Sequence, residues 1–268
     1  MHPIEQLRHL AEVGEADAGV LAEEAASALG ALGSDRRALL TGARRLLEAH
    51  PSVGPLWWLA ARLLVADDVA AAASLAASRL AGDSTSDELA ASLPSGATVV
   101  AAATDRVTLA VSQRPDLEVR LVGSPGARWR RGGGSPVAHR SPAALGEALE
   151  GATLALVEAR AAGRSGVVVW GLDRAVATGA LVAGLSLWAL VGEGRLLPEA
   201  LFASVLARLG AVPPAPAETG AVVLGAGGLL VPAARLAAVV GPSGPATPAV
   251  GLARPSCPSP PELLGPGG

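Results

Sequence analysis

Lysine is absent from this chain of 268 residues, and cysteine occurs once. All 21 basic residues are arginine, which most simply reflects the codon bias of a GC-rich genome, and no Gly-Lys-Ser or Gly-Lys-Thr phosphate loop can exist. A single Cys257 excludes an internal disulfide and the usual thiolate metal sites. Because the four histidines (2, 9, 50 and 139) show no ligand spacing, we predict neither a metal site nor a cofactor.

Aromatic residues are scarce, and no strong charge of one sign is present. With 2% aromatic and 50% hydrophobic residues, the core must consist of small, closely packed elements, which favours an α or α/β fold. A formal net charge of −3 gives no field that attracts nucleic acid or an acidic membrane. Because no secretory segment precedes the first helix, we predict a cytoplasmic protein that binds no nucleic acid and no membrane.

The longest uncharged run covers residues 175–192. It only reaches the lower limit for a membrane-spanning helix, and glycine and polar residues interrupt it. We therefore predict a short helix, a glycine turn and a strand that is buried on both faces of a parallel sheet.

Residues 1–93 are predicted to form a helical domain. Within 35–50, Leu39, Leu46 and Leu47 fall on one helical face, and a second helix begins near Pro55. Trp57 and Trp58 are adjacent in that second helix and cannot share one stripe. Either one of them packs against a neighbouring domain or subunit, or both belong to the core.

After Pro94, short apolar strands alternate with helices. The predicted strands are 97–103, 117–123, 153–157 and 186–191, and the predicted helices are 104–114, 142–149, 173–183 and 198–209. Such alternation with short connections indicates βαβ units on a parallel sheet. The predicted fold is therefore α/β, with an N-terminal helical domain followed by a Rossmann-like parallel βαβ domain over 94–210. The Pro- and Gly-rich residues 211–268 are predicted to pack partly on the α/β domain, with strands within 220–230 and 236–244.

Residues 123–140 are rich in glycine, proline and arginine and are predicted to form a solvated loop. Arg128, Arg130, Arg131 and Arg140 in this segment could alternatively gather a phosphate.

Parallel α/β sheets bind ligands beyond the carboxyl ends of their strands. This rule gives a candidate ligand-binding set of Thr104, Asp105, Gly123, Ser124, Glu158, Arg160 and Arg195. Glu158 is the one carboxylate at a predicted strand end, and arginines such as Arg160 and Arg195 bind anions in a bidentate manner. The competing interpretation is a structural ion pair between Glu158 and an arginine at the rim of the sheet.

Three stretches carry a family resemblance: "ATVVAAATDRVTLAV" (97–111), "LALVEARAAGRSGVVV" (154–169) and "LLVPAARLAAVVGPSG" (229–244). Their order, over about residues 34–245, resembles the family that joins the regulatory subunits of eukaryotic translation initiation factor 2B to methylthioribose-1-phosphate and ribose-1,5-bisphosphate isomerases. The resemblance implies a homodimer formed through the βαβ domain and a small phosphorylated ligand.

The same resemblance implies that the catalytic residues of the isomerases are absent from this chain. It implies a Cys, an Asp and an Asn-Lys pair in the isomerases, and these positions fall at Ala103, Arg160 and Trp170-Gly171. An alanine can act neither as acid nor as nucleophile, and an arginine cannot serve as a base.

Three functional hypotheses follow. The first is a non-catalytic regulatory or scaffolding homo-oligomer that retains a small phosphorylated ligand. The second is a sugar-phosphate isomerase with relocated chemistry, in which Glu158 is the base. The third is an interaction module that binds a protein partner through an exposed tryptophan of its helical domain, and it fails if both Trp57 and Trp58 are buried within one subunit.

Overall fold

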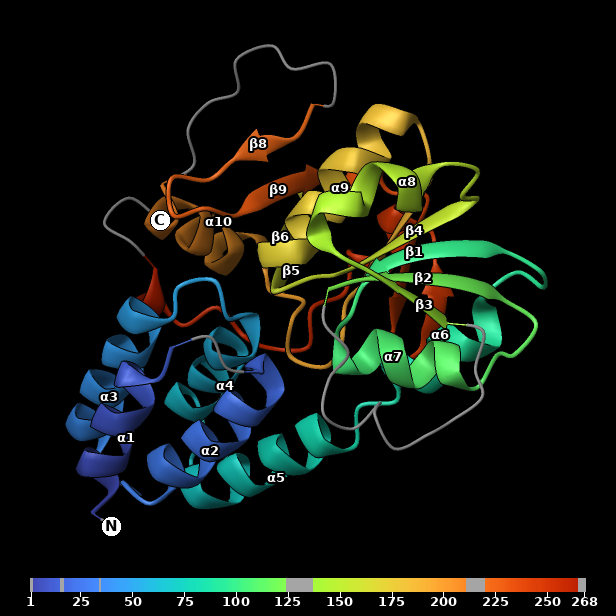
Figure 1. Cartoon of the computed structure of the whole chain (residues 1–268). Coiled ribbons are helices and arrows are strands. Elements are labelled where there is room, and N and C mark those ends of the chain that lie inside the picture. The colour runs from blue at the N-terminus through green and yellow to red at the C-terminus, as the bar shows by residue number, and fades with distance from the viewer. Residues whose placement is uncertain (1, 15–16, 34, 124–136, 211–219, 265–268) are drawn as a thin grey trace.

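Five helices at the N-terminal end pack into a bundle (Figure 1). The computed structural model describes residues 2–14, 17–33, 35–123, 137–210 and 220–264. Aspartates at 17, 35 and 68 accept backbone N–H groups at the starts of three of these helices, as good N-cap residues do. The helices are α1 (Pro3–Glu12), α2 (Ala18–Gly30), α3 (Arg36–Ala49), α4 (Gly54–Leu64) and α5 (Val69–Ala81).

Both tryptophans of α4 are completely buried. Trp57 donates its indole N–H to the carbonyl of Pro51 at 3.0 Å, and Trp58 donates to the hydroxyl of Ser256 at 2.9 Å. Both therefore belong to the core of a single subunit. The interaction hypothesis that depends on an exposed tryptophan at these positions is wrong, because one indole packs inward and the other is covered by the C-terminal segment.

A seven-stranded sheet follows the bundle, in the order β11-β10-β7-β4-β1-β2-β3. All neighbouring pairs are parallel except β10 with β11. This confirms the predicted α/β fold. The strands are β1 (Thr98–Ala102), β2 (Glu118–Val122), β3 (Val137–Arg140), β4 (Leu154–Glu158), β7 (Ser186–Leu190), β10 (Ala238–Gly241) and β11 (Gly244–Ala246).

The sheet is buried on both faces, as the uninterrupted apolar strands predict. Along β1, Val99 and Ala101 pack in one apolar cluster with Val107 of α7 (Asp105–Ser112), whereas Val100 packs in another with Val176 of α9 (Gly171–Ala183). Helix α6 (Thr85–Ser92) contacts α7, β10 and β11. On the opposite face, α8 (Leu145–Leu149) packs against α9 and follows the 3-10 turn Pro142–Ala144.

The uncharged run at 175–192 is confirmed as helix, turn and strand. Helix α9 ends at Ala183, Gly184 adopts a left-handed conformation with φ of 67°, and β7 begins at Ser186. Glycine takes up this conformation without the steric cost that a Cβ would bring. Among the described helices, none is long and apolar enough to cross a membrane.

The segment 154–169 contributes strands to two different sheets. After β4, the chain turns back as the hairpin of β5 (Ala161–Gly163) and β6 (Gly166–Val169), and both of these strands are buried. β6 pairs with β9 (Leu229–Pro232), which pairs with β8 (Val222–Val223), so a second, antiparallel sheet is formed. Because β9 lies some 60 positions further along the chain, sequence periodicity alone cannot indicate this pairing.

The prediction of a loop over 123–140 is wrong at residues 137–140. They form β3, the edge strand parallel to β2, so Arg140 lies in the sheet, whereas Arg128, Arg130 and Arg131 lie outside the described residues. The strands predicted in the C-terminal segment are confirmed as β8, β9 and β10. This segment also reaches the helical bundle, where Leu263 joins the core. The remaining elements are α10 (Glu199–Arg208), α11 (Pro248–Gly251) and the 3-10 turns Ala233–Arg235 and Pro261–Leu263.

Candidate functional site

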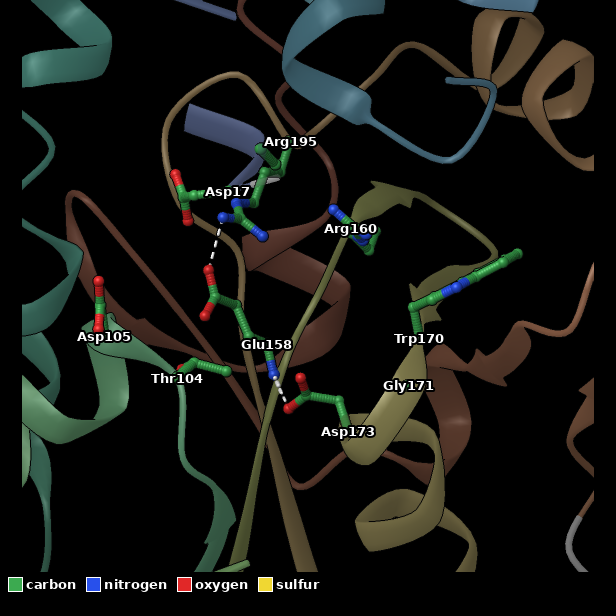
Figure 2. Close-up of a pocket in the computed structure, with 10 residues that line it drawn as sticks. Asp17, Thr104, Asp105, Glu158, Arg160, Trp170, Gly171, Asp173 and Arg195 are labelled. Atoms are coloured by element: carbon green, nitrogen blue, oxygen red, sulfur yellow. Dashed lines mark hydrogen bonds and ion pairs between the residues drawn. The ribbon is translucent and has the colours of Figure 1, made fainter. Parts of the chain in front are cut away.

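A cavity of about 330 Å³ lies at the carboxyl ends of β1 and β4. From β1 the chain continues to β2 on one side, whereas β4 occupies the other side, so the strand order reverses here. Open α/β sheets bind ligands at such a switch point. The lining residues are Asp17, Ala18, Thr104, Asp105, Glu158, Arg160, Trp170, Gly171, Asp173 and Arg195 (Figure 2).

Five of the seven candidate residues line this cavity: Thr104, Asp105, Glu158, Arg160 and Arg195. Gly123 is not among the described lining residues. Its φ of 121° is open mainly to glycine, and an added Cβ would lie 2.8 Å from Leu172. The seventh candidate, Ser124, lies outside the described residues.

Three helices begin at the cavity, and their first turns differ. The Asp17 carboxylate caps α2 by accepting the N–H groups of Gly19 at 2.9 Å and Val20 at 3.0 Å. Thr104 caps α7 through its hydroxyl. Helix α9 begins after Trp170 without any side-chain cap. The start of α9 is therefore the one of these three ends where no side chain competes with a ligand for the first-turn N–H groups.

Glu158 is held in a buried ion pair. Its Oε1 lies 2.5 Å from Nη2 of Arg195, whose side chain is 2% exposed, and 3.2 Å from Nε of Arg106 on α7. Arg195 also donates through Nη1 to the carbonyl of Ala159. The structural ion pair considered from the sequence is thus present, and it lies in the wall of the cavity.

Arg106 links the Glu158 ion pair to Asp83, which lies in the connection between α5 and α6. Arg106 contacts Asp83 through Nη1, and Asp83 accepts N–H groups from Thr85 at 3.0 Å and Glu193 at 2.9 Å. Burial acts to raise the pKa of the Asp83 carboxyl, but Arg106 and these hydrogen bonds outweigh it and hold the pKa below its ordinary value. The chain Asp83–Arg106–Glu158–Arg195, here called the ion network, links the end of the bundle to the sheet.

Asp173 is a second buried carboxyl in the cavity that the sequence did not single out. It lies in the first turn of α9, and its Oδ1 accepts the backbone N–H of Glu158 at 2.8 Å (Figure 2). Burial, reinforced by the nearby Glu158 carboxylate, raises the pKa of Asp173 to about 7. In the sequence, Asp173 is indistinguishable from any acidic residue at the start of a helix. The β5–β6 hairpin brings α9 beside β4, and no local sequence pattern indicates this contact.

The cavity therefore has two unlike walls. Figure 2 shows Asp17, Asp105 and Glu158 on one side, together with Arg195, and Arg160, Trp170 and the start of α9, which carries Asp173, on the other. Among the described residues, no group of three histidine, cysteine, aspartate or glutamate side chains is placed to hold a metal ion.

No family model and no curated protein matches this chain in sequence. Solved structures do match in fold. The translation initiation factor eIF-2B of Pyrococcus horikoshii OT3 has a TM-score of 0.70 at 15% identity, over 93% of this chain and 98% of that one. The eIF2B beta subunit of Chaetomium thermophilum has a TM-score of 0.62 at 17% identity, over 92% of this chain and 86% of that one.

An enzyme is among the similar structures. The 5-methylthioribose 1-phosphate isomerase of Pyrococcus horikoshii OT3 has a TM-score of 0.56 at 14% identity, over 92% of this chain and 85% of that one. These matches cover nearly the whole chain and agree with the resemblance drawn from its three stretches. At such identities the likeness concerns the fold, and the chain has the fold that eIF2B subunits and this isomerase share.

Proposed function

We propose that this protein binds a small phosphorylated ligand at the β1/β4 cavity and acts as a regulatory or scaffolding homo-oligomer rather than as an enzyme. The observation that carries the proposal is the division of the cavity into two walls. Arg160 and the uncapped start of α9 suit a phosphate, and the carboxylates on the other side suit hydroxyl groups.

The phosphate is expected at the α9 side for an electrostatic reason. First-turn N–H groups carry the positive end of the helix dipole, and Arg160 adds a full positive charge beside them. Asp173, with a pKa of about 7, is protonated in a large fraction of molecules at neutral pH and can then donate a hydrogen bond to an anion. The ligand's hydroxyls would face Asp17 and Asp105.

Two observations support a non-catalytic role. Glu158, the base required by the isomerase hypothesis, is engaged by Arg195 and Arg106, so it is poorly placed to take a proton from a substrate. The positions that the resemblance assigns to the isomerase Cys and Asp hold Ala103 and Arg160.

The oligomer part of the proposal is supported by one similar structure, a tetrameric eIF2B-beta2-delta2 complex from C. thermophilum, with a TM-score of 0.56 at 16% identity. We expect a homodimer through the α/β part of this chain. Sedimentation velocity at micromolar concentration tests this, and a monomer at all concentrations would contradict it.

A second candidate function is isomerisation of a sugar phosphate with Asp173, rather than Glu158, as the acid and base. The observation that favours it is the buried Asp173 carboxyl with a pKa of about 7, since a group that moves a proton between carbon atoms works best near the pH of the reaction. Loss of turnover in Asp173→Asn, with ribose 5-phosphate binding retained, would establish it. Absence of turnover in the wild-type protein would exclude it for the substrates tested.

Calorimetric titration with ribose 5-phosphate tests the binding proposal. We expect Arg160→Met to weaken binding at least tenfold, because a charge-assisted contact with phosphate is lost, and Arg160→Lys to retain part of the affinity. Arg164→Met is the matched control, because Arg164 is exposed at the tip of the same hairpin and does not line this cavity. Equal binding by wild type, Arg160→Met and Arg164→Met, or no binding by the wild type, would overturn the proposal.

A further inference from the structure

A separate cavity of about 500 Å³ lies at the carboxyl ends of β7 and β10. Its walls come mainly from the segment after β7, the β10–β11 hairpin, and α11 with the residues that follow it. It shares no lining residue with the β1/β4 cavity. Ligands of open α/β sheets bind beyond the carboxyl ends of parallel strands, and small-molecule sites measure about 300–1,000 Å³. Position and size therefore suit a second small-molecule site.

Glu193 contributes a largely buried carboxylate to this cavity. Its side chain is 13% exposed, and its Oε1 lies 2.7 Å from Nη2 of Arg79. Although this ion pair is short, its geometry is not that of a hydrogen bond, so Oε1 has no hydrogen-bond partner within the described residues. Burial raises the pKa of the Glu193 carboxyl, against the opposing effect of Arg79. A buried carboxylate in this state calls for a further donor, and a cationic ligand group is one.

The segment that carries Glu193 is fixed from its other side. The backbone N–H of Glu193 donates to Oδ2 of Asp83, in the ion network, at 2.9 Å. The next residue, Gly194, has a φ of 74°, and a Cβ there would lie 3.3 Å from Pro55 and 3.4 Å from Trp58. Only glycine adopts this conformation without strain. A carboxylate on so constrained a segment needs little ordering when a ligand binds.

Arg254 gives the same cavity a positive charge that is not neutralised. It follows α11, is exposed, and its side chain forms no hydrogen bond or ion pair with another described residue. Arg79 differs, because it pairs with Glu193 and its guanidinium carbon lies 5.4 Å from the centre of the Trp58 ring. A guanidinium without a partner can bind a carboxylate through two parallel hydrogen bonds.

Aliphatic side chains line the cavity beside these charges. Val191 and Val239 are buried, whereas Val250 is 63% exposed. An apolar ligand group placed over Val250 would remove this surface from water, which is favourable. The cavity thus combines a buried anionic group, an exposed cationic group and an apolar surface.

We propose that this cavity binds a zwitterion of the amino-acid type, with its ammonium group at Glu193, its carboxylate at Arg254 and an aliphatic side chain against Val250. An ammonium group donates up to three hydrogen bonds and supplies the donor that Oε1 of Glu193 lacks. A free amino acid and a short peptide with free ends share this chemistry. The inference is independent of the proposed function, because it concerns a different cavity.

Calorimetric titration of the full-length protein with leucine and with leucylleucine tests the inference. Each compound is used in three forms: free, N-acetylated, which removes the ammonium group, and amidated, which removes the carboxylate. We expect at least one of the two free compounds to bind, and at least tenfold more tightly than either of its blocked forms, because each block removes a charge-assisted contact. Tighter binding of leucine would identify a free amino acid as the ligand, and tighter binding of leucylleucine a peptide.

Two variants assign the ends of the ligand. Glu193→Gln is expected to weaken binding of the free form at least tenfold and to leave binding of the N-acetylated form as in the wild type. Arg254→Met is expected to weaken the free form similarly and to leave the amidated form as in the wild type. Arg164→Met is the control, because Arg164 is exposed but does not line this cavity. Thermal unfolding shows that each variant is folded.

Several outcomes would overturn the inference. One is that neither free compound binds the folded wild-type protein. Another is that a blocked form binds as tightly as the free form, a result that depends on no variant. An Arg164→Met protein with the same loss as Arg254→Met would also overturn it, because the effect would then not be local. Binding of ribose 5-phosphate to the wild type bears only on the β1/β4 cavity, so the two proposals can fail separately.

Discussion

The two walls of the β1/β4 cavity use charge in opposite ways. On the ion-network wall, Glu158 is buried and is balanced by Arg195 and Arg106. On the α9 wall, Arg160 and the uncapped helix start line the cavity, and Asp173 is a buried carboxyl whose pKa is raised to about 7, mainly by burial. Under the proposed function, similar residue types therefore support the structure on one side and bind a ligand on the other.

Position at a strand end does not by itself indicate whether a carboxylate is held in an ion pair. Glu158 satisfies the strand-end rule, but the neighbouring arginines determine its role. Asp173 lies 15 positions later, in a helix, and only the buried hairpin brings it to the same cavity. Substitutions on each wall test this difference between Glu158 and Asp173.

The largest effect is expected for Arg195→Met. Removal of this guanidinium leaves the Glu158 carboxylate buried with only the longer contact to Arg106, and loss of one partner of a buried ion pair typically costs about 3–5 kcal/mol. Urea denaturation should show this decrease in the free energy of unfolding. A decrease below about 1 kcal/mol would show that the ion network contributes little and would remove the contrast between the walls.

The second prediction concerns pH and Asp173. Its pKa is raised from 3.8 to about 7 on folding, so the folded state holds a proton that the unfolded state releases between these values. The contribution of Asp173 to the free energy of unfolding is therefore greatest below about pH 4. It decreases by up to about 4 kcal/mol as the pH rises to about 7.

Asp173→Asn should remove this pH dependence, because the amide keeps an acceptor for the Glu158 N–H but does not ionise. Denaturation at pH 5 and pH 8 measures the difference between wild type and variant. An equal pH dependence in both proteins would show that Asp173 is ionised throughout and is not distinct from Glu158.

How much of this could be predicted from the sequence depends on the range of the interactions. The helices, the parallel strands and five cavity residues follow from local periodicity and from the strand-end rule. The pairing of β6 with β9, the burial of both Trp57 and Trp58, and the meeting of Asp173 with β4 depend on contacts between distant segments. Arg195 lines the cavity as predicted, and its contact with Glu158 is the ion pair that the sequence analysis gave as the competing interpretation.

A smaller effect is expected for Asp17→Ala at the rim of the cavity. Loss of the cap of α2 should cost about 1 kcal/mol, whereas Asp17→Ser, which keeps a capping oxygen, should cost much less. Thermal unfolding of the two variants measures the difference. If they prove equally destabilised, the loss would reflect charge at the cavity rather than the helix cap.

The smallest effect is expected far from the cavity, for Arg36→Ala. Its ion pair with Glu262 is 3.4 Å long, and the arginine side chain is 62% exposed, so solvent screens it. The free energy of unfolding should change by less than about 0.5 kcal/mol. A loss as large as that of Arg195→Met would mean that burial does not set the strength of ion pairs in this protein.

Glu158 is proposed to support the structure, and Arg160 is proposed to bind the ligand. The most direct test is to measure both the free energy of unfolding and the dissociation constant for ribose 5-phosphate in Glu158→Gln and Arg160→Met. We predict that Glu158→Gln mainly destabilises the fold, by about 2–4 kcal/mol, and that Arg160→Met weakens binding at least tenfold. A stable Glu158→Gln protein that no longer binds, beside an Arg160→Met protein that binds normally, would contradict the claim.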